Sequence, residues 1–595
     1  MAKYEIVDGV GIIPKGVKRI GTYDFDRYTP LTSVVIPEGV TKMGSGVFYG
    51  CTSLTSVVIP EGVTEIGCKA FAYCTSLTSV VIPEGVTKIE WDAFDGCTSL
   101  TSIVIPSSVT VIGRDAFRGC TSLTSIVVEE GNSVYDSREG CNAIIETATN
   151  KLIQGSASTI IPSSVTSIGE KAFQGCSPLT NVVIPSSVTE IGYEAFSGCT
   201  SLTSVVIPSS VTEIVWNVFW GCTSLTSVEI PSSVTEIGSY AFGGCTSLTS
   251  IVVEEGNSVY DSREGCNAII ETATNTLVQG CVSTIIPTSV TEIGDKAFEG
   301  CTSLTSIVIP EGVEKIGERA FYGCTSLTSI EIPSSVTAIG RFAFSGCTSL
   351  TSIVIPEGVK MIGENAFEDC SSLTSVVIPS SVTEIGAAVF SKCTSLTSIE
   401  IPSSVTEIGT AVFRNCTSLT SVVIPEGVTK IGNESFHGCT SLISVEIPSS
   451  VAEIGNCAFM GCSSLTSIEI PSSVTMIGSE AFDGCTSLTS VVIPEGVTNI
   501  GAGAFDGCTS LTSVVINGKI KKLDIRVFGL CENLESITLP TGVNKIAENA
   551  FVRCTSLKAI YVPAKKYDYY YERIPSPFYS LIVEMEPVKK AKKKK

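Results

Sequence analysis

The chain repeats nearly the same 23 residues along most of its length. The stretch CTSLTSVVIPEGVTEIGCKAF, residues 51–71, is followed from residue 74 by CTSLTSVVIPEGVTKIEWDAF. A phenylalanine closes each unit, and 21 such units occur within the 595 residues. A fixed period of this size indicates a solenoid, because one unit cannot bury its own apolar face whereas stacked units share a continuous core. The repeat therefore predicts one continuous repeat array instead of the several globular domains that the length alone would suggest.

Each unit contains the alternation expected of a strand in a parallel sheet. In LTSVVI, residues 54–59, the leucine, the first valine and the isoleucine are expected to face the core, whereas Ser56 and Val58 face outward. Pro60 ends the strand because it has no N–H for the sheet. A second short extended pair follows, and Phe71 then returns to the core on a short helical or 3₁₀ turn. The sequence thus predicts a mainly β repeat solenoid.

The cysteines and phenylalanines are expected to form columns in the core. Twenty of the 25 cysteines occupy one repeat position. Stacked coils would bring their α-carbons to about 5 Å, but parallel side chains have the wrong geometry for a disulfide. No CxxC pair occurs, which argues against zinc. We therefore expect no metal and no cofactor, and a structural core ladder that includes Cys51, Cys74, Cys97, Cys120, Phe71 and Phe94.

Two insertions and both ends depart from the repeat. Each insertion adds 33 residues to one unit, and its NAIIET and following segments are typical of a β-hairpin. Diverging ends are expected to cap the stack. The predicted organisation is an N-terminal cap at 1–11, a solenoid at 12–563 with enlarged hairpin-bearing coils at about 128–160 and 253–285, a C-terminal cap at 564–587 and a disordered Lys-rich tail at 588–595.

Composition and motifs exclude several classes of function. A formal charge of −21 disfavours specific nucleic-acid binding, although the tail KKAKKKK could contact anionic surfaces. The apolar runs are far shorter than the roughly 20 residues of a transmembrane helix, and the first residues show no secretory signal. His437 is the single histidine, and no P-loop, GxGxxG, GxSxG or HExxH motif occurs. We therefore expect no enzymatic activity and no catalytic residue.

Two surfaces are candidates for binding a partner protein. The outward-facing strand positions carry valine in most units and glutamate in some, which β-propensity alone would also explain. The variable positions after Ile-Gly carry all three tryptophans, which packing between adjacent turns would also explain. The candidate partner-binding residues are Trp91, Trp216, Trp220, Tyr193, Tyr240, Val58, Val81, Val104, Glu400, Glu446 and Glu469.

The repeat pattern CxxLxxIxIPxxVxxIGxxAFxxC resembles the BspA-type leucine-rich repeat family over about Ile12 to Pro563. The resemblance implies a right-handed superhelix or horseshoe with a parallel sheet, here with about 21 coils of 23 residues. The family is known for surface proteins of host-associated bacteria and some protists that bind host proteins and other bacteria. It thus implies a non-enzymatic protein-binding scaffold, secreted or at the cell surface, in adhesion or in recognition of a host or partner cell.

An intracellular interaction scaffold in the cytoplasm is the alternative. It is favoured by the lack of a visible signal sequence and by about twenty free thiols, which are safest in a reducing compartment.

Overall fold

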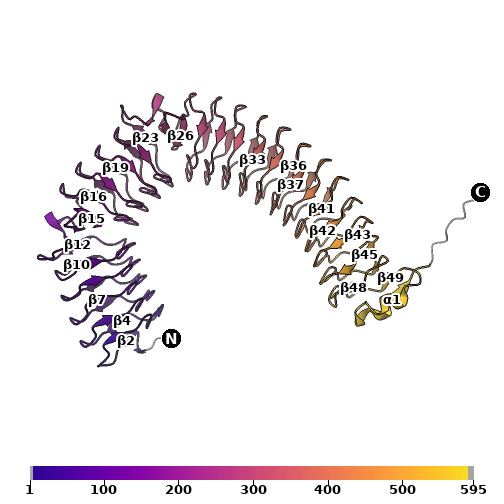
Figure 1. Cartoon of the computed structure of the whole chain (residues 1–595), viewed down its shortest axis with the longest axis horizontal. Coiled ribbons are helices and arrows are strands. Elements are labelled where there is room, and N and C mark those ends of the chain that lie inside the picture. Colours follow the sequence, from indigo (N-terminus) through magenta and orange to yellow (C-terminus); the bar gives the residue numbers. More distant parts are fainter. Residues whose placement is uncertain (1–3, 587–595) are drawn as a thin grey trace, which may run out of the picture. The chain divides into compact units, whose positions relative to one another are not determined.

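The computed structural model describes residues 4–586 and divides into two compact units, Met1–Ile285 and Ile286–Lys595. Within each unit, turns of about 23 residues stack side by side (Figure 1). Most turns contribute one strand of three or four residues and a second strand of two residues. The mainly β parallel solenoid is confirmed, but the expected count of about 21 coils is slightly low. The chain has about 25 turns, because the insertions and the segment after the last phenylalanine form turns as well.

The first unit contains both strand series and two insertions. The longer strands are β2 (Val10–Ile12), β4 (Ser33–Val35), β6 (Ser56–Val58), β8 (Ser79–Val81), β10 (Ser102–Ile105), β12 (Ser125–Val128), β17 (Asn181–Val183), β19 (Ser204–Val206), β21 (Ser227–Ile230) and β23 (Ser250–Val253). The shorter strands are β3 (Arg19–Ile20), β5 (Lys42–Met43), β7 (Glu65–Ile66), β9 (Lys88–Ile89), β11 (Val111–Ile112), β16 (Ser167–Ile168), β18 (Glu190–Ile191), β20 (Glu213–Ile214) and β22 (Glu236–Ile237). At the start, β1 (Glu5–Val7) pairs antiparallel with β2.

The second unit continues the same two series. The longer strands are β28 (Ser306–Val308), β30 (Ser329–Glu331), β32 (Ser352–Val354), β34 (Ser375–Val377), β36 (Ser398–Glu400), β38 (Ser421–Val423), β40 (Ser444–Glu446), β43 (Ser490–Ile493), β45 (Ser513–Ile516), β47 (Ser536–Thr538) and β49 (Ala559–Val562). The shorter strands are β27 (Glu292–Ile293), β29 (Lys315–Ile316), β31 (Ala338–Ile339), β33 (Met361–Ile362), β35 (Glu384–Ile385), β37 (Glu407–Ile408), β39 (Lys430–Ile431), β41 (Glu453–Ile454), β42 (Met476–Ile477), β44 (Asn499–Ile500), β46 (Lys522–Leu523) and β48 (Lys545–Ile546).

Neighbouring turns pair in parallel and in register, so that equivalent residues lie side by side. Val58 of β6, for example, lies opposite Val81 of β8. The threonine before most of the longer strands adds to this ladder. Both the backbone N–H and the hydroxyl of Thr78 donate to the carbonyl oxygen of Thr55, at 3.1 and 3.2 Å. The residues that contact across turns are therefore those separated by one repeat in the sequence.

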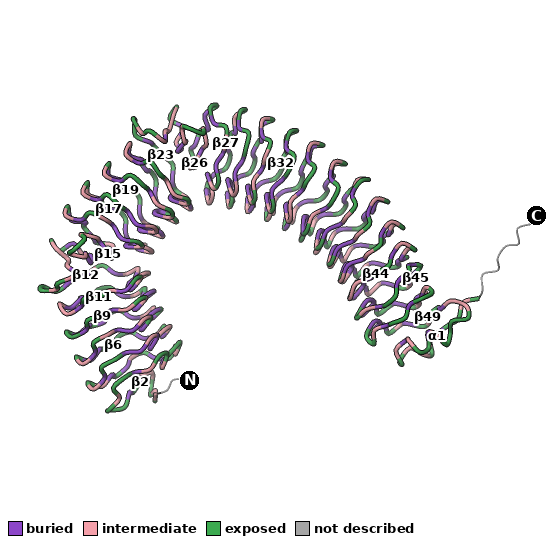
Figure 2. The backbone as a smooth tube through the Cα atoms, viewed as in Figure 1, coloured by how far each residue is buried: buried purple, intermediate pink, exposed green. Residues whose placement is uncertain are grey.

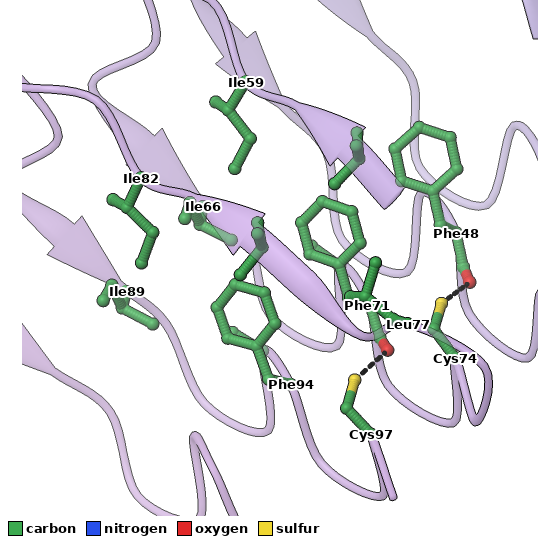
Figure 3. Close-up of a cluster of buried hydrophobic side chains, with 14 of the residues drawn as sticks. Phe48, Ile59, Ile66, Phe71, Cys74, Leu77, Ile82, Ile89, Phe94 and Cys97 are labelled. Atoms are coloured by element: carbon green, nitrogen blue, oxygen red, sulfur yellow. Dashed lines mark hydrogen bonds between the residues drawn. The ribbon is translucent and has the colours of Figure 1, made fainter. Parts of the chain in front are cut away.

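The core consists of columns of identical side chains. Phe48, Phe71 and Phe94 are fully buried, and their rings stack with centroids 5.4 and 5.2 Å apart (Figure 3). The cysteine thiols form a second column beside them. The Sγ of Cys74 donates a hydrogen bond of 3.0 Å to the carbonyl oxygen of Phe48, and that of Cys97 donates one of 3.1 Å to Phe71. In each unit, buried segments recur at the same places of every turn (Figure 2).

The segment that carries the phenylalanine forms a series of turns instead of the continuous helical or 3₁₀ turn expected from the sequence. The N–H groups of Lys69, Phe71 and Tyr73 donate to carbonyl oxygens of the next turn at 2.9, 2.8 and 2.6 Å. This pattern requires positive φ at Lys69 (57°) and Tyr73 (62°). Many repeats place glycine at the Tyr73 position, where glycine adopts this conformation at lower cost. Bonds between turns thus alternate with local bonds of the 3₁₀ type, such as those that the N–H groups of Ala70 and Ala72 donate over 3.1 Å to the carbonyl oxygens of Gly67 and Lys69.

Each insertion forms strands of its own. The first contains β13 (Tyr135–Asp136), the 3₁₀ turn η1 (Arg138–Gly140), β14 (Ile144–Glu146) and β15 (Lys151–Gln154), and the second contains β24 (Tyr260–Asp261), η2 (Arg263–Gly265), β25 (Ile269–Glu271) and β26 (Thr276–Gln279). The pairs β14–β15 and β25–β26 are antiparallel. Gly155 follows β15 and lies against the ring of Phe173, where a β-carbon would be 2.1 Å from a ring atom.

The C-terminal segment contains α1 (Tyr567–Tyr571), η3 (Ser576–Leu581) and β50 (Ile582–Glu584). β50 pairs in parallel with β49 and extends the sheet by one strand. Tyr570 is fully buried, and its hydroxyl donates to the carbonyl oxygen of Pro540. The predicted Lys-rich tail lies outside the described residues.

Candidate protein-binding surfaces

The outward strand positions form exposed rows. In the first unit, Val58, Val81 and Val104 are 71, 66 and 45% exposed. In the second unit, Glu400 and Glu446 occupy the same repeat position and are exposed. Glu469 is also exposed and bridges in parallel to Glu446. The strand face is therefore mainly valine in some stretches and alternates valine with glutamate in others.

The aromatic candidates of the first unit fall into three places. The rings of Tyr193 and Trp216 are stacked, with centroids 5.2 Å apart and planes inclined by 4°. Trp220 and Tyr240 both lie close to Gly243, since a β-carbon at Gly243 would be 3.2 Å from each ring. Trp91 is 64% exposed and lies in an earlier turn. The stacked pair is at once an exposed feature and a contact between adjacent turns.

A groove runs along the shorter strands of the first unit, beside this stacked pair. Tyr193, Trp216 and Tyr240 line it, and its volume is about 780 Å³. Glu190, Glu213 and Glu236 line the same groove, and all three carboxylates are exposed. Glu213 lies directly opposite Glu236 in the parallel pairing of β20 and β22. Three successive TEI segments, at residues 189–191, 212–214 and 235–237, are the sequence signal for this row, whose glutamates were not among the predicted binding residues.

A smaller cavity of about 270 Å³ lies at the first insertion and is lined by charged side chains. The Nζ of Lys171 is 3.0 Å from Oδ2 of Asp115. Arg118 donates two hydrogen bonds, of 2.9 and 2.6 Å, to the carboxylate of Asp95. These ion pairs neutralise much of the charge around the cavity. The Lys171–Asp115 pair joins turns on either side of the insertion, whereas the Arg118–Asp95 pair joins two neighbouring turns before it.

The thiols have the environment of structural residues. Burial raises the pKa of Cys416 and of Cys462 to about 12, which keeps both thiols protonated at neutral pH. Cys51, Cys74, Cys97 and Cys120 are likewise buried. Within residues 4–586 there is no group of three or more His, Cys, Asp or Glu side chains placed to hold a metal ion. His437 is half-buried, and its Nδ1 lies 3.8 Å from Oε2 of Glu434.

A sequence model of the BspA type leucine-rich repeat region matches six stretches of the chain, at residues 11–133, 154–264, 278–396, 338–466, 384–489 and 452–572. The chain belongs to the BspA-type leucine-rich repeat family. Among curated proteins no significant match is found. Within the described part of this BspA-type protein, no helix is both long and apolar enough to cross a membrane.

Several solved structures are similar to the BspA-type chain. A leucine-rich repeat protein from Bacteroides ovatus is 30% identical, with 76% of this chain and 98% of that one covered and a TM-score of 0.46. A leucine-rich cell surface protein from Faecalibacterium prausnitzii is 30% identical, with 70% and 91% covered and a TM-score of 0.39. A leucine-rich repeat protein from T. pallidum is 32% identical, with 37% and 82% covered and a TM-score of 0.26.

Proposed function

We propose that this leucine-rich repeat scaffold is a non-enzymatic protein-binding protein of the cell surface that acts in adhesion or in recognition of a host or neighbouring cell. The observation that carries the proposal is the in-register stacking within each unit, which repeats the same exposed side chains from turn to turn. Regularly spaced weak contacts gain strength by avidity, because each contact after the first forms at high effective concentration.

The surface location rests on family membership and is compatible with the chemistry of the thiols. The alternative of a cytoplasmic scaffold drew support from the many free cysteines. In the structure, 23 of the 25 cysteines are buried and only Cys68 and Cys457 are partly exposed. A thiol that solvent cannot reach is protected from oxidation by the fold itself. The cysteine content therefore gives little reason to prefer a reducing compartment.

The location is tested by mild protease treatment of intact source cells, followed by mass spectrometry of the released peptides. We expect peptides from residues 51–554 in the released fraction, without cytosolic marker proteins. Recovery of these peptides only after lysis would contradict the surface location and favour the cytoplasmic scaffold.

The Lys-rich tail is proposed as an accessory contact to anionic surfaces, and its removal should leave protein binding intact.

Protein binding is tested with the purified chain on host and neighbouring cells. Replacing Trp216 and Trp220 by alanine should reduce binding if the aromatic positions form the contact surface. Tyr322→Ala is the matched control, because Tyr322 is an aromatic residue of the second unit with 37% exposure. Equal binding by the parent chain, the double variant and the control would move the site to the valine and glutamate rows of the strand face. Absence of binding by the parent chain would refute the proposed function.

A further inference from the structure

The groove beside the Tyr193–Trp216 pair has one aromatic face left open. Tyr193 covers one face of the Trp216 ring by stacking at 5.2 Å. The position equivalent to Trp216 in the next turn is Ser239, whose small side chain also lines the groove. Trp216 consequently remains 48% exposed. Among aromatic side chains, tryptophan forms the strongest cation–π interaction with a cation that lies over an open face of its ring.

The carboxylates beside this ring lack the ion-pair partners that two of their equivalents in the second unit have. In the second unit, Lys315 lies opposite Glu292 in the sheet and forms an ion pair of 2.7 Å. Lys430 and Glu453 pair in the same way at 3.3 Å. At Glu190, Glu213 and Glu236 the same position carries glutamate in three successive turns. Among residues 4–586, no lysine or arginine lies within 4 Å of these three carboxylates.

Such a row of like charges is unfavourable by itself, since like charges directly opposite in a sheet repel one another. The one lysine that lines the groove, Lys151, lies two turns before Glu190, because it is opposite Ser167 in the sheet and Ser167 is opposite Glu190. Arg114 and Lys171 lie over the Tyr193 ring, at 5.5 and 6.0 Å from its centroid. Lys171 is paired with Asp115, and a nitrogen of Arg114 is 3.5 Å from the carboxylate of Glu170. These three cations therefore lie toward the Glu190 and Tyr193 end of the groove, and Glu213 and Glu236 follow in the next turns.

We propose that this groove binds an extended lysine- or arginine-rich segment of a partner protein. One cation of the segment lies over the open face of Trp216, and the next is held by Glu213 and Glu236. Alternate side chains of an extended segment recur about 7 Å apart, and three neighbouring turns span about 10 Å, so two cations fit along the row. The inference deepens the proposed function and rests on it, because it names the chemistry of the partner segment.

The test uses the full chain and a fluorescein-labelled nonapeptide of alternating Arg and Ser, with the Glu–Ser peptide as the charge-reversed control. We expect saturable binding of the Arg peptide alone, which weakens as salt rises from 50 to 500 mM. Glu213→Gln with Glu236→Gln should weaken it by about fivefold or more, since each exposed pair contributes modestly and the two losses add. Trp216→Ala should weaken it by about three- to fivefold through loss of the cation–π contact.

The matched control is Glu384→Gln with Glu407→Gln. These residues occupy the same repeat position in the second unit and line a groove without aromatic residues. This double variant should change the affinity by less than about twofold. Equal effects of the two double variants, or equal binding of the Glu peptide, would overturn the inference.

Failure of the inference can be separated from failure of the proposed function. All four substituted glutamates are exposed, so folding is checked by an unchanged melting temperature. Cell binding that persists in the Glu213→Gln, Glu236→Gln variant, without peptide binding by the parent chain, would refute only the cationic partner. Peptide binding at the groove without any cell binding or surface exposure would refute the surface role and leave the groove assignment standing.

Discussion

The buried thiol column predicts an unusual pattern of cysteine reactivity. Only the thiolate reacts with reagents such as DTNB or iodoacetamide, so both exposure and pKa control the rate. Burial raises the pKa of Cys416 and Cys462 from 9.0 to about 12. At pH 8 this shift alone lowers the thiolate fraction about a thousandfold, because each pKa unit is a factor of ten. Exclusion of the reagent from the core slows the reaction further.

The assay is DTNB titration of the native and the unfolded chain at pH 8, with alkylation and mass spectrometry to assign the sites. We expect fast reaction in the native state only at partly exposed cysteines, with the 23 buried thiols reacting after unfolding. Cys68 should react before Cys457. Burial and the nearby Glu480 carboxylate raise the pKa of Cys457 to about 11, so its rate should rise about tenfold per pH unit up to that value.

The control is the double variant Cys68→Ser, Cys457→Ser, which should show no fast phase. Native alkylation of Cys416 or Cys462 at the rate of Cys68 would refute the buried column. A disulfide between ladder cysteines in the native chain would refute it as well.

Three further outcomes follow from the packing within the second unit. Phe367 is fully buried between Phe344 and Phe390, with centroids 5.3 and 5.7 Å away, so Phe367→Ala should lower the free energy of unfolding by about 3–5 kcal/mol. The exposed control Val354→Thr should change it by less than about 0.5 kcal/mol in the same denaturant titration. Gly363→Ala should lower the free energy of unfolding by about 1–3 kcal/mol, because the new β-carbon would lie 2.6 Å from the backbone of Gly340. An unchanged denaturation midpoint would show that the turns are not so closely spaced. Burial and the charge of Asp506 raise the pKa of Asp483 from 3.8 to about 6. The free energy of unfolding should therefore fall as pH rises from about 4 to 6, because the Asp483 carboxyl loses its proton at lower pH in the unfolded chain than in the folded chain. Asp483→Asn should abolish that part of the fall and stabilise the chain at pH 7 by about 1 kcal/mol after allowance for solvent screening, as measured by thermal melts at pH 4 and 7.

Much of the core could be predicted from one unit of the sequence. Leu54, Val57 and Ile59 are buried, and Ser56 and Val58 are exposed, as the strand alternation requires. The coil count was slightly low because it followed the phenylalanines, and the insertions form turns without using that residue. At the binding surface, the contact between Tyr193 and Trp216 was available from their separation of one repeat, but the unpaired glutamate row next to it was not recognised.

The repeat length and its pattern by themselves determined a parallel solenoid with stacked phenylalanine and cysteine columns, because any in-register stack of identical turns places identical side chains together. Only the tertiary structure decided the conformation of the segment before each cysteine. There, the backbone of Phe71 bonds to Ala93 of the next turn, and Lys69 adopts a positive φ to allow the arrangement. A single unit cannot show this outcome, because local bonds within a turn compete with bonds to a neighbour whose position exists only in the folded stack.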